Sequence, residues 1–183
     1  MDKLSISQSI YKFKVENHKD LKNHILGEIE KYKFEKPIGN EIFSISKGDY
    51  SLDHKKTYWP IFLRNIKQYL DAFIEDFFKE YNRENTNLIF SNYWFQQYEK
   101  EDSHPFHIHT NSDYSMVYYV ELPDSENSTV FMNHNKKKVQ FDLEEGDLIL
   151  FPSLVFHSSP KNNSDKRKTI ISGNLNFVNK LVS

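Results

Sequence analysis

The sequence predicts a mainly β fold with α-helices (α+β), in which a jelly-roll barrel is buttressed by helices near the N-terminus. Two observations predict it. After Asn85 the chain consists of short apolar runs separated by turn residues, and before Asn85 two segments carry apolar residues at helical spacing. Aromatic residues make up 15% of the 183 residues, which suits β-rich cores and aromatic-lined pockets.

The first half of the chain is expected to support the barrel. Residues 1–16 alternate polar and apolar side chains, which predicts a strand. From about residue 19 to residue 31 apolar side chains recur every four positions, and residues 58–81 carry an aromatic stripe that follows Pro60. Both segments are therefore expected to be helices with one face in the core.

The second half is expected to form the barrel itself. Its turn-type sequences include PDSEN, NHNKK, EEGD and PKNNSDK. The strands predicted between such turns are residues 88–98, 106–110, 115–122, 129–133, 138–142, 147–151, 155–158 and 168–177. We expect one domain, residues 1–183, with residues 1–85 as a helical support region with an N-terminal strand and residues 86–178 as the jelly-roll core.

Composition excludes several classes of protein. The formal net charge is -2, so the chain lacks the basic field of a nucleic-acid-binding protein, and there is no strong nucleic-acid signal. The absence of cysteine excludes disulfides, thiolate metal sites and a cysteine nucleophile. No apolar run has the length of a signal or membrane-spanning segment, so we expect a cytoplasmic protein with no membrane partner. A homo-oligomer is compatible with this composition.

Three histidines are the candidate metal ligands and catalytic residues. His107 and His109 are two residues apart, so in a strand they project from the same face, whereas the fold must bring His157 to them. Imidazole ligands suit Fe, Zn, Cu or Ni, and the familiar oxygen-activating Fe(II) site combines two His with one carboxylate. The third ligand is therefore left open between His109 and a carboxylate such as Asp113. A shifted register, with His109 and Asn111 as the pair, is also open.

The segment GDLILFPSLVFHSSP indicates how His157 is presented. A buried strand that is followed by Pro152 and then by His157 is poorly suited to a core and well suited to presenting a ligand. Lys168 opens the next strand, KTIISGNLNF, and its cation is expected to point along the barrel towards the metal. There it would bind the carboxylate of a cosubstrate, a role for which Arg167 competes.

Three ordered motifs, HIHTNSDYSMVYYV, GDLILFPSLVFHSSP and KRKTIISGNLNF, resemble the Fe(II)/2-oxoglutarate-dependent dioxygenases, in particular a prolyl-hydroxylase-like subgroup of bacteria and phages. The resemblance covers residues 88–177. It implies a double-stranded β-helix in which His107 and His157 hold Fe(II), with His109 at the place where most relatives carry Asp. It also implies 2-oxoglutarate as cosubstrate and O2 as oxidant.

The resemblance further implies a reaction and the residues that bind the cosubstrate. The distal carboxylate of 2-oxoglutarate would meet Lys168 or Arg167, with Ser172 as the hydroxyl residue that often follows the basic residue in relatives. Tyr119, or its neighbour Tyr118, would hydrogen-bond the cosubstrate. Oxidative decarboxylation of 2-oxoglutarate to succinate and CO2 would then be coupled to hydroxylation of a C–H bond in an unknown substrate.

The substrate is the least determined part of the prediction. Trp94 and Gln97, on the strand that enters the site, are the candidate substrate contacts. The substrate itself can be a small molecule or a protein or peptide side chain.

Two other hypotheses explain the same motifs. The order His-x-His, Gly-Asp, Pro and His is also typical of a cupin-type metalloprotein, which would be a cosubstrate-free dioxygenase, an isomerase or a sugar binder. Lys168 distinguishes these possibilities, because a cupin does not need a cation that faces the metal. A binding module with a structural metal fits less well, since structural zinc commonly uses cysteine.

Overall fold

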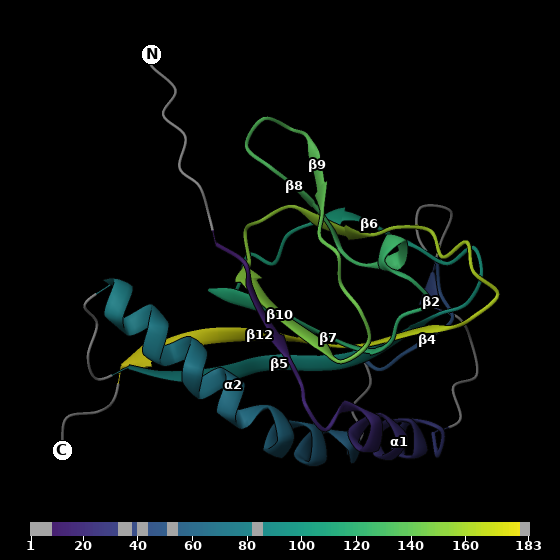
Figure 1. Cartoon of the computed structure of the whole chain (residues 1–183), viewed down its shortest axis with the longest axis horizontal. Coiled ribbons are helices and arrows are strands. Elements are labelled where there is room, and N and C mark those ends of the chain that lie inside the picture. Colours follow the sequence, from purple (N-terminus) through teal and green to yellow (C-terminus); the bar gives the residue numbers. More distant parts are fainter. Residues whose placement is uncertain (1–8, 33–37, 40–43, 51–54, 82–85, 180–183) are drawn as a thin grey trace.

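The computed structural model describes residues 9–32, 38–39, 44–50, 55–81 and 86–179. Two antiparallel sheets stack on each other, and two helices cover the outer face of the larger sheet (Figure 1). The elements are β1 (Tyr11–Lys14), α1 (His18–Ile29), β2 (Ile38–Gly39), β3 (Ser44–Ile45), β4 (Lys47–Gly48), α2 (Tyr58–Tyr81), β5 (Thr86–Tyr98), β6 (His104–His107), β7 (Tyr114–Glu121), the 3-10 turn η1 (Ser125–Asn127), β8 (Val130–Met132), β9 (Lys138–Gln140), β10 (Asp147–Pro152), β11 (His157–Ser159) and β12 (Lys168–Asn179).

The larger sheet has the strand order β1-β10-β7-β12-β5-β4, and the smaller sheet has the order β6-β11-β8-β9. The longest ladder joins β12 to β5, from Lys168 opposite Tyr98 to Asn179 opposite Thr86. In the smaller sheet His157 pairs with His107 on one side and with Phe131 on the other. Segments far apart in the sequence therefore meet at the start of β11.

Both faces of the larger sheet are buried, and β7 illustrates how. Its side chains alternate, so Met116 and Tyr118 join the core under the helices, whereas Val117 and Tyr119 join the core between the two sheets. The helices contribute Leu21, Ile25, Ile29, Phe62, Ile66 and Phe73, each less than 3% exposed. Burial of such a side chain contributes about 1.5–3 kcal/mol.

The predicted elements are confirmed with small shifts of their ends. The eight strands of the second half are present, and the helices predicted at residues 19–31 and 58–81 are observed as α1 and α2. The strand predicted within residues 1–16 is observed as β1, and residues 1–8 lie outside the described part of the chain. The short strands β2, β3 and β4 were not predicted, because two-residue strands carry no periodic signal. Within the described residues no helix has the length and apolarity to cross a membrane.

Candidate metal and cosubstrate site

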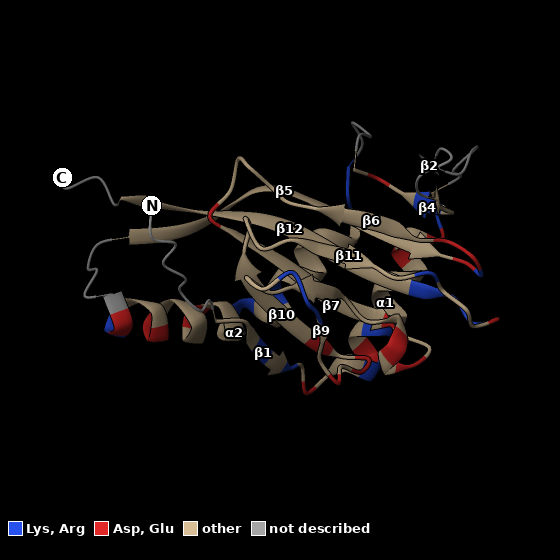
Figure 2. Cartoon of the chain, turned by 90° about the horizontal axis from the view of Figure 1, so that it is seen from above, with Lys and Arg blue, Asp and Glu red and all other residues tan. Residues whose placement is uncertain are grey.

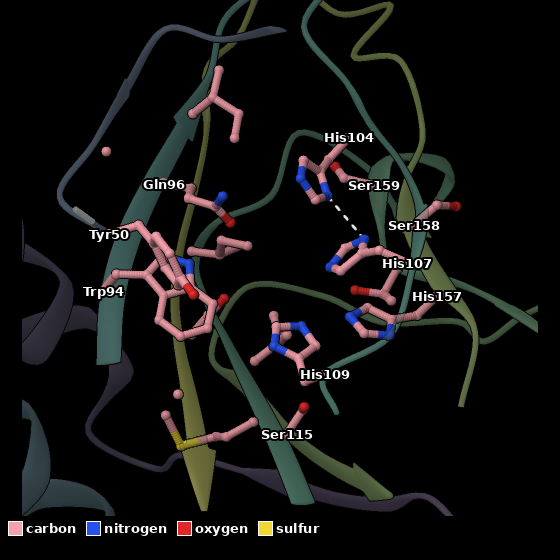
Figure 3. A pocket seen from close by; sticks show the side chains of 18 of the residues that line it. Tyr50, Trp94, Gln96, His104, His107, His109, Ser115, His157, Ser158 and Ser159 are labelled. Atoms are coloured by element: carbon pink, nitrogen blue, oxygen red, sulfur yellow. Dashed lines mark hydrogen bonds between the residues drawn. The ribbon is translucent and has the colours of Figure 1, made fainter. Parts of the chain in front are cut away.

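A cavity of about 370 Å³ lies between the two sheets. One wall carries histidines from β6 and β11, and the opposite wall carries side chains of β5 and β12 (Figure 3). Residues that line it include His104, His107, His109, His157, Ser159, Trp94, Gln96, Tyr98, Lys168 and Ser172.

The three predicted metal ligands meet in this cavity. His107 is the last residue of β6 and His157 is the first residue of β11, and the two are direct partners in the ladder. Side-chain nitrogens of His107, His109 and His157 lie within 4.8 Å of one another. Their ring centroids are 4.3 Å apart for His107 and His157, and 5.2 Å apart for His109 and His157.

His109 reaches the cluster by a different route from the predicted one. We expected His107 and His109 to lie on one strand, but β6 ends at His107, so that part of the prediction is wrong. The backbone N–H of His109 donates to the carbonyl of Ser153, at 2.9 Å, in the segment between β10 and β11. The loop after β6 is thus attached to the segment that leads to His157.

Hydrogen bonds to the backbone orient two of the imidazoles. Nδ1 of His107 lies 2.8 Å from the carbonyl of Pro105, and Nδ1 of His157 lies 2.9 Å from the carbonyl of Val155. A carbonyl only accepts, so each Nδ1 carries the proton and each Nε2 keeps a lone pair. Metal-binding histidines are commonly held in this way, so the donor set fits a metal ion such as Fe(II).

The imidazoles are neutral at physiological pH. Burial, together with a smaller effect of the nearby His107, lowers the pKa of His157 to about 3 and that of His109 to about 4. Burial also lowers the pKa of His107. Because a metal binds only the deprotonated nitrogen, no proton has to be displaced from these side chains near pH 7.

A fourth histidine, His104, was missed by the sequence analysis. Its Nδ1 lies 3.0 Å from Nδ1 of His107, and burial lowers its pKa to about 4. Three residues separate His104 from His107, so strand periodicity gives no reason to place both in one cavity. The only signal was the density of histidines in HPFHIH.

The other candidates for the third ligand lie elsewhere. The Asp113 carboxylate accepts the backbone N–H of Phe177 at 2.8 Å, which ties it to β12. The carbonyl of Asn111 faces the Asn176 side chain at 3.5 Å. Within the described residues, the group of potential ligands therefore contains three histidines and no carboxylate.

Lys168, the first residue of β12, is a buried cation in the same cavity and is 1% exposed. Its Nζ donates to the carbonyl of Asn127 at 2.7 Å and to Oγ of Ser159 at 2.8 Å. Burial lowers the pKa of Lys168 to about 7. Among the described residues no carboxylate forms an ion pair with it, which is unusual for a buried lysine.

Two predicted cosubstrate contacts point away from the cavity. Arg167 forms a two-pronged pair with Glu121, with nitrogen–oxygen distances of 2.8 and 3.1 Å. Tyr118 lies in the core under the helices, where its hydroxyl is hydrogen-bonded to Nδ1 of His18 at 2.7 Å. Each of the two residues is a direct neighbour of a residue that faces inward, because Tyr118 precedes Tyr119 in β7 and Arg167 precedes Lys168, the first residue of β12.

Two other predicted cosubstrate contacts lie on the inner side. Ser172 lines the cavity. Tyr119 lies in the core between the sheets, where its hydroxyl is 2.7 Å from Oγ1 of Thr129 and accepts the backbone N–H of Thr129 at 3.0 Å. Thr129 itself lines the cavity, so Tyr119 is one residue removed from it.

Of the two predicted substrate contacts, only Trp94 lines the cavity. Gln97 is 1% exposed, and its amide donates to Oγ1 of Thr169 at 3.2 Å. The residue that shares the face of Trp94 is Gln96, two positions along β5 (Figure 3). Alternation along the strand would have identified it, because residues 94 and 97 cannot share a face in a regular strand.

Residues 92–174 match the family model described as "Putative 2OG-Fe(II) oxygenase". A search among curated proteins finds no match to the sequence. The fold is similar to that of AviO1 from Streptomyces viridochromogenes, at 10% identity, a TM-score of 0.66, and coverage of 92% of this chain and 90% of that one. It is also similar to a prolyl-4-hydroxylase from Pseudomonas putida, at 12% identity, a TM-score of 0.64, and coverage of 93% of each chain.

A third similar structure is HygX from Streptomyces hygroscopicus, with nickel and 2-oxoglutarate bound. It is 10% identical, with a TM-score of 0.65, and the match covers 96% of this chain and 84% of that one. The predicted jelly-roll fold and the predicted resemblance are therefore confirmed.

Proposed function

We propose that this chain is a 2-oxoglutarate- and Fe(II)-dependent oxygenase and that it hydroxylates a C–H bond of its substrate, a proposal that the family match of residues 92–174 and the fold support. The observation that carries the proposal is the presence, in one cavity, of three neutral imidazoles and a buried lysine without a carboxylate partner among the described residues. The first group suits a metal, and the second suits an organic anion.

His107, His109 and His157 would hold the Fe(II). The bound iron supplies the activation of O2 and a binding place for the 2-oxo acid end of the cosubstrate. The carbonyls of Pro105 and Val155 keep two of the imidazoles in the tautomer that offers Nε2. Since none of the three ligands carries negative charge, the protein leaves the charge of the cation uncompensated, which favours an anionic cosubstrate.

Lys168 would bind the distal carboxylate of 2-oxoglutarate. An ammonium has three N–H donors, and Lys168 uses two of them on Asn127 and Ser159. A carboxylate that accepts the third would restore the charged form that burial disfavours, so cosubstrate binding raises the pKa of Lys168. Ser172 lines the same cavity and can add a hydroxyl contact to this carboxylate.

Anaerobic titration of the Fe(II)-loaded protein with 2-oxoglutarate tests the proposal. We expect the weak visible charge-transfer band of the chelate, and succinate formation once O2 is admitted. Lys168→Met should weaken the binding of 2-oxoglutarate. Lys166→Met, which removes an exposed lysine two residues before β12, should leave that binding unchanged. Metal binding without a band or succinate would contradict the proposal and favour the cupin-type alternative.

A further inference from the structure

The wall of the cavity that faces the histidines contains an indole N–H without an acceptor. Trp94 is 4% exposed, and no described residue accepts the hydrogen of its Nε1. The indole ring lies nearly parallel to the imidazole of His109, with 5.9 Å between centroids. A ligand group that accepts this hydrogen would therefore lie beside the candidate metal ligands (Figure 3). A buried donor without an acceptor is rare in native proteins and calls for a partner.

Gln96 adds a second donor to the same wall, and a chain of hydrogen bonds sets the direction of its amide. Lys168 can only donate while it is charged, and it donates to Oγ of Ser159. The Ser159 hydroxyl in turn bonds the phenol oxygen of Tyr98. The Tyr98 hydroxyl then donates to Oε1 of Gln96 at 3.1 Å. The Gln96 oxygen thereby accepts a hydrogen bond within the protein, whereas no described residue accepts one from its NH2 group, which is the part left for a ligand.

The same wall lacks negative charge. None of the residues that line the described cavity is Asp or Glu. In Figure 2 the acidic positions lie mainly on α1, on α2 and in loops. A cationic substrate would meet no counter-ion here and would be repelled by Lys168 and by a bound metal. Tyr50, 54% exposed and packed edge-to-face on Trp94 at 4.8 Å, offers an apolar surface at the side of the indole.

We propose that Trp94 and Gln96, which we call the donor wall, recognise the substrate by donating hydrogen bonds to an uncharged carbonyl oxygen. The substrate class is then an amide or similar carbonyl compound, and not a polyol or an amine. A hydroxyl group needs an acceptor for its own hydrogen, whereas a carbonyl needs none, and the donor wall offers two donors but only the second lone pair of the Gln96 oxygen as an acceptor. This inference deepens the proposed function and rests on it for the place of the reacting carbon.

The test uses three probes built on a saturated six-membered ring. N-acetylpiperidine presents a carbonyl and no donor, methyl β-D-xylopyranoside presents hydroxyls, and piperidine is a cation at pH 7. The chain has two tryptophans, so Trp59→Phe leaves the Trp94 indole as the only one in a proton–nitrogen correlation spectrum. The full-length protein is titrated with and without Zn(II), a diamagnetic stand-in, in the presence of 2-oxoglutarate.

We expect N-acetylpiperidine to move the Trp94 indole proton downfield in a saturable way and to bind at least about fivefold more tightly than the other two probes. Trp94→Phe, in an otherwise wild-type chain, keeps an aromatic ring but removes the donor. We expect it to lower the affinity for N-acetylpiperidine by about tenfold, as measured in ligand-observed spectra. Gln96→Glu replaces the NH2 donor by an acceptor and should reverse the order of N-acetylpiperidine and piperidine. Asn87→Asp adds the same charge at an exposed position of β5 and should leave the affinities for N-acetylpiperidine and for piperidine unchanged.

The outcomes separate this inference from the proposed function. If 2-oxoglutarate binds but the indole signal responds only to the xyloside or to piperidine, or to no probe, the inference that the donor wall recognises a carbonyl is wrong. If N-acetylpiperidine shifts the indole signal while Zn(II) and 2-oxoglutarate do not bind, the inference about the donor wall is supported and the proposed function is contradicted.

Discussion

Each face of the larger sheet contains a buried charged residue, but only one of the two has a partner of opposite charge among the described residues. On the face under the helices, the fully buried Asp49 accepts the Tyr58 hydroxyl and the backbone N–H of Phe95, each at 2.8 Å, and lies 3.8 Å from Lys56. On the cavity face, Lys168 is equally buried but has only neutral partners among the described residues. The partners of Asp49 compensate its charge within the fold, whereas the charge of Lys168 is left for a ligand to neutralise.

The largest expected effect is the loss of the metal from the cavity face. His157→Ala removes one of the three proposed metal ligands, and we expect Fe(II) affinity to fall by at least about 100-fold and turnover to disappear. The free energy of unfolding should change by less than about 2 kcal/mol, because no core aromatic is lost. Calorimetric metal titration and chemical denaturation measure both quantities. His134→Ala, in the exposed turn after β8, is the matched control and should retain metal.

The second prediction separates the two buried charges. Asp49→Ala removes the acceptor of the Tyr58 hydroxyl and of the Phe95 N–H, and it removes the carboxylate that pairs with Lys56. We therefore expect the free energy of unfolding to fall by about 3–5 kcal/mol. Lys168→Met removes an unpaired charge, so stability should stay the same or rise by about 1–4 kcal/mol, while the Kd of 2-oxoglutarate increases by roughly 100-fold. Urea denaturation and cosubstrate titration of both variants give the answer. A Lys168→Met protein that is less stable but binds 2-oxoglutarate normally would show that Lys168 serves the stability of the fold and does not bind the cosubstrate.

The third prediction concerns pH. Burial lowers the pKa of Lys168 from the ordinary lysine value of 10.5 to about 7 in the folded chain. Between these values the unfolded chain holds the proton and the folded chain has lost it, so this residue makes the free energy of unfolding rise with pH. Below pH 7 both states are protonated, and this contribution no longer changes with pH.

Cosubstrate affinity should change in the opposite direction. A carboxylate binds the charged lysine, so the Kd of 2-oxoglutarate should increase as the pH rises above about 7, by up to tenfold per unit. His109 and His157 titrate at about 4 and 3, and burial raises the pKa of Tyr98, so these cavity groups lie outside this window. Titrations from pH 6 to 9 measure the slope, and Lys168→Met should flatten it. An equal slope in that variant would assign the effect to another group.

The smallest expected effect is at His104. Its Nδ1 faces Nδ1 of His107 at 3.0 Å, but the carbonyl of Pro105 also holds that nitrogen at 2.8 Å. His104→Ala should therefore lower Fe(II) affinity by about tenfold and no more. His24→Ala on α1, whose ring bonds its own helix at the Asp20 carbonyl, is the control. A loss as large as that of His157→Ala would mean that His104 is itself a ligand.

Sequence patterns predicted the two helices, β1, the eight strands of the second half and three of the four histidines of the cavity. The helical spacing of apolar residues predicted α1 and α2, and turn residues separated the eight strands of the barrel. His107 was identified by its spacing of two residues from His109, and His157 by its position after a buried strand and Pro152. The loop position of His109 was not predictable, because it depends on a hydrogen bond to Ser153, which is remote in sequence.

Alternation along each strand determined which neighbours point in opposite directions, as in the pairs Tyr118 and Tyr119, and Gln96 and Gln97. Only the tertiary structure decided which member of each pair faces inward. The physical reason is that this sheet is covered on both sides, by helices on one face and by the smaller sheet on the other. Burial is then similar on the two faces, and a sequence pattern that reports burial cannot tell the cavity from the helical core.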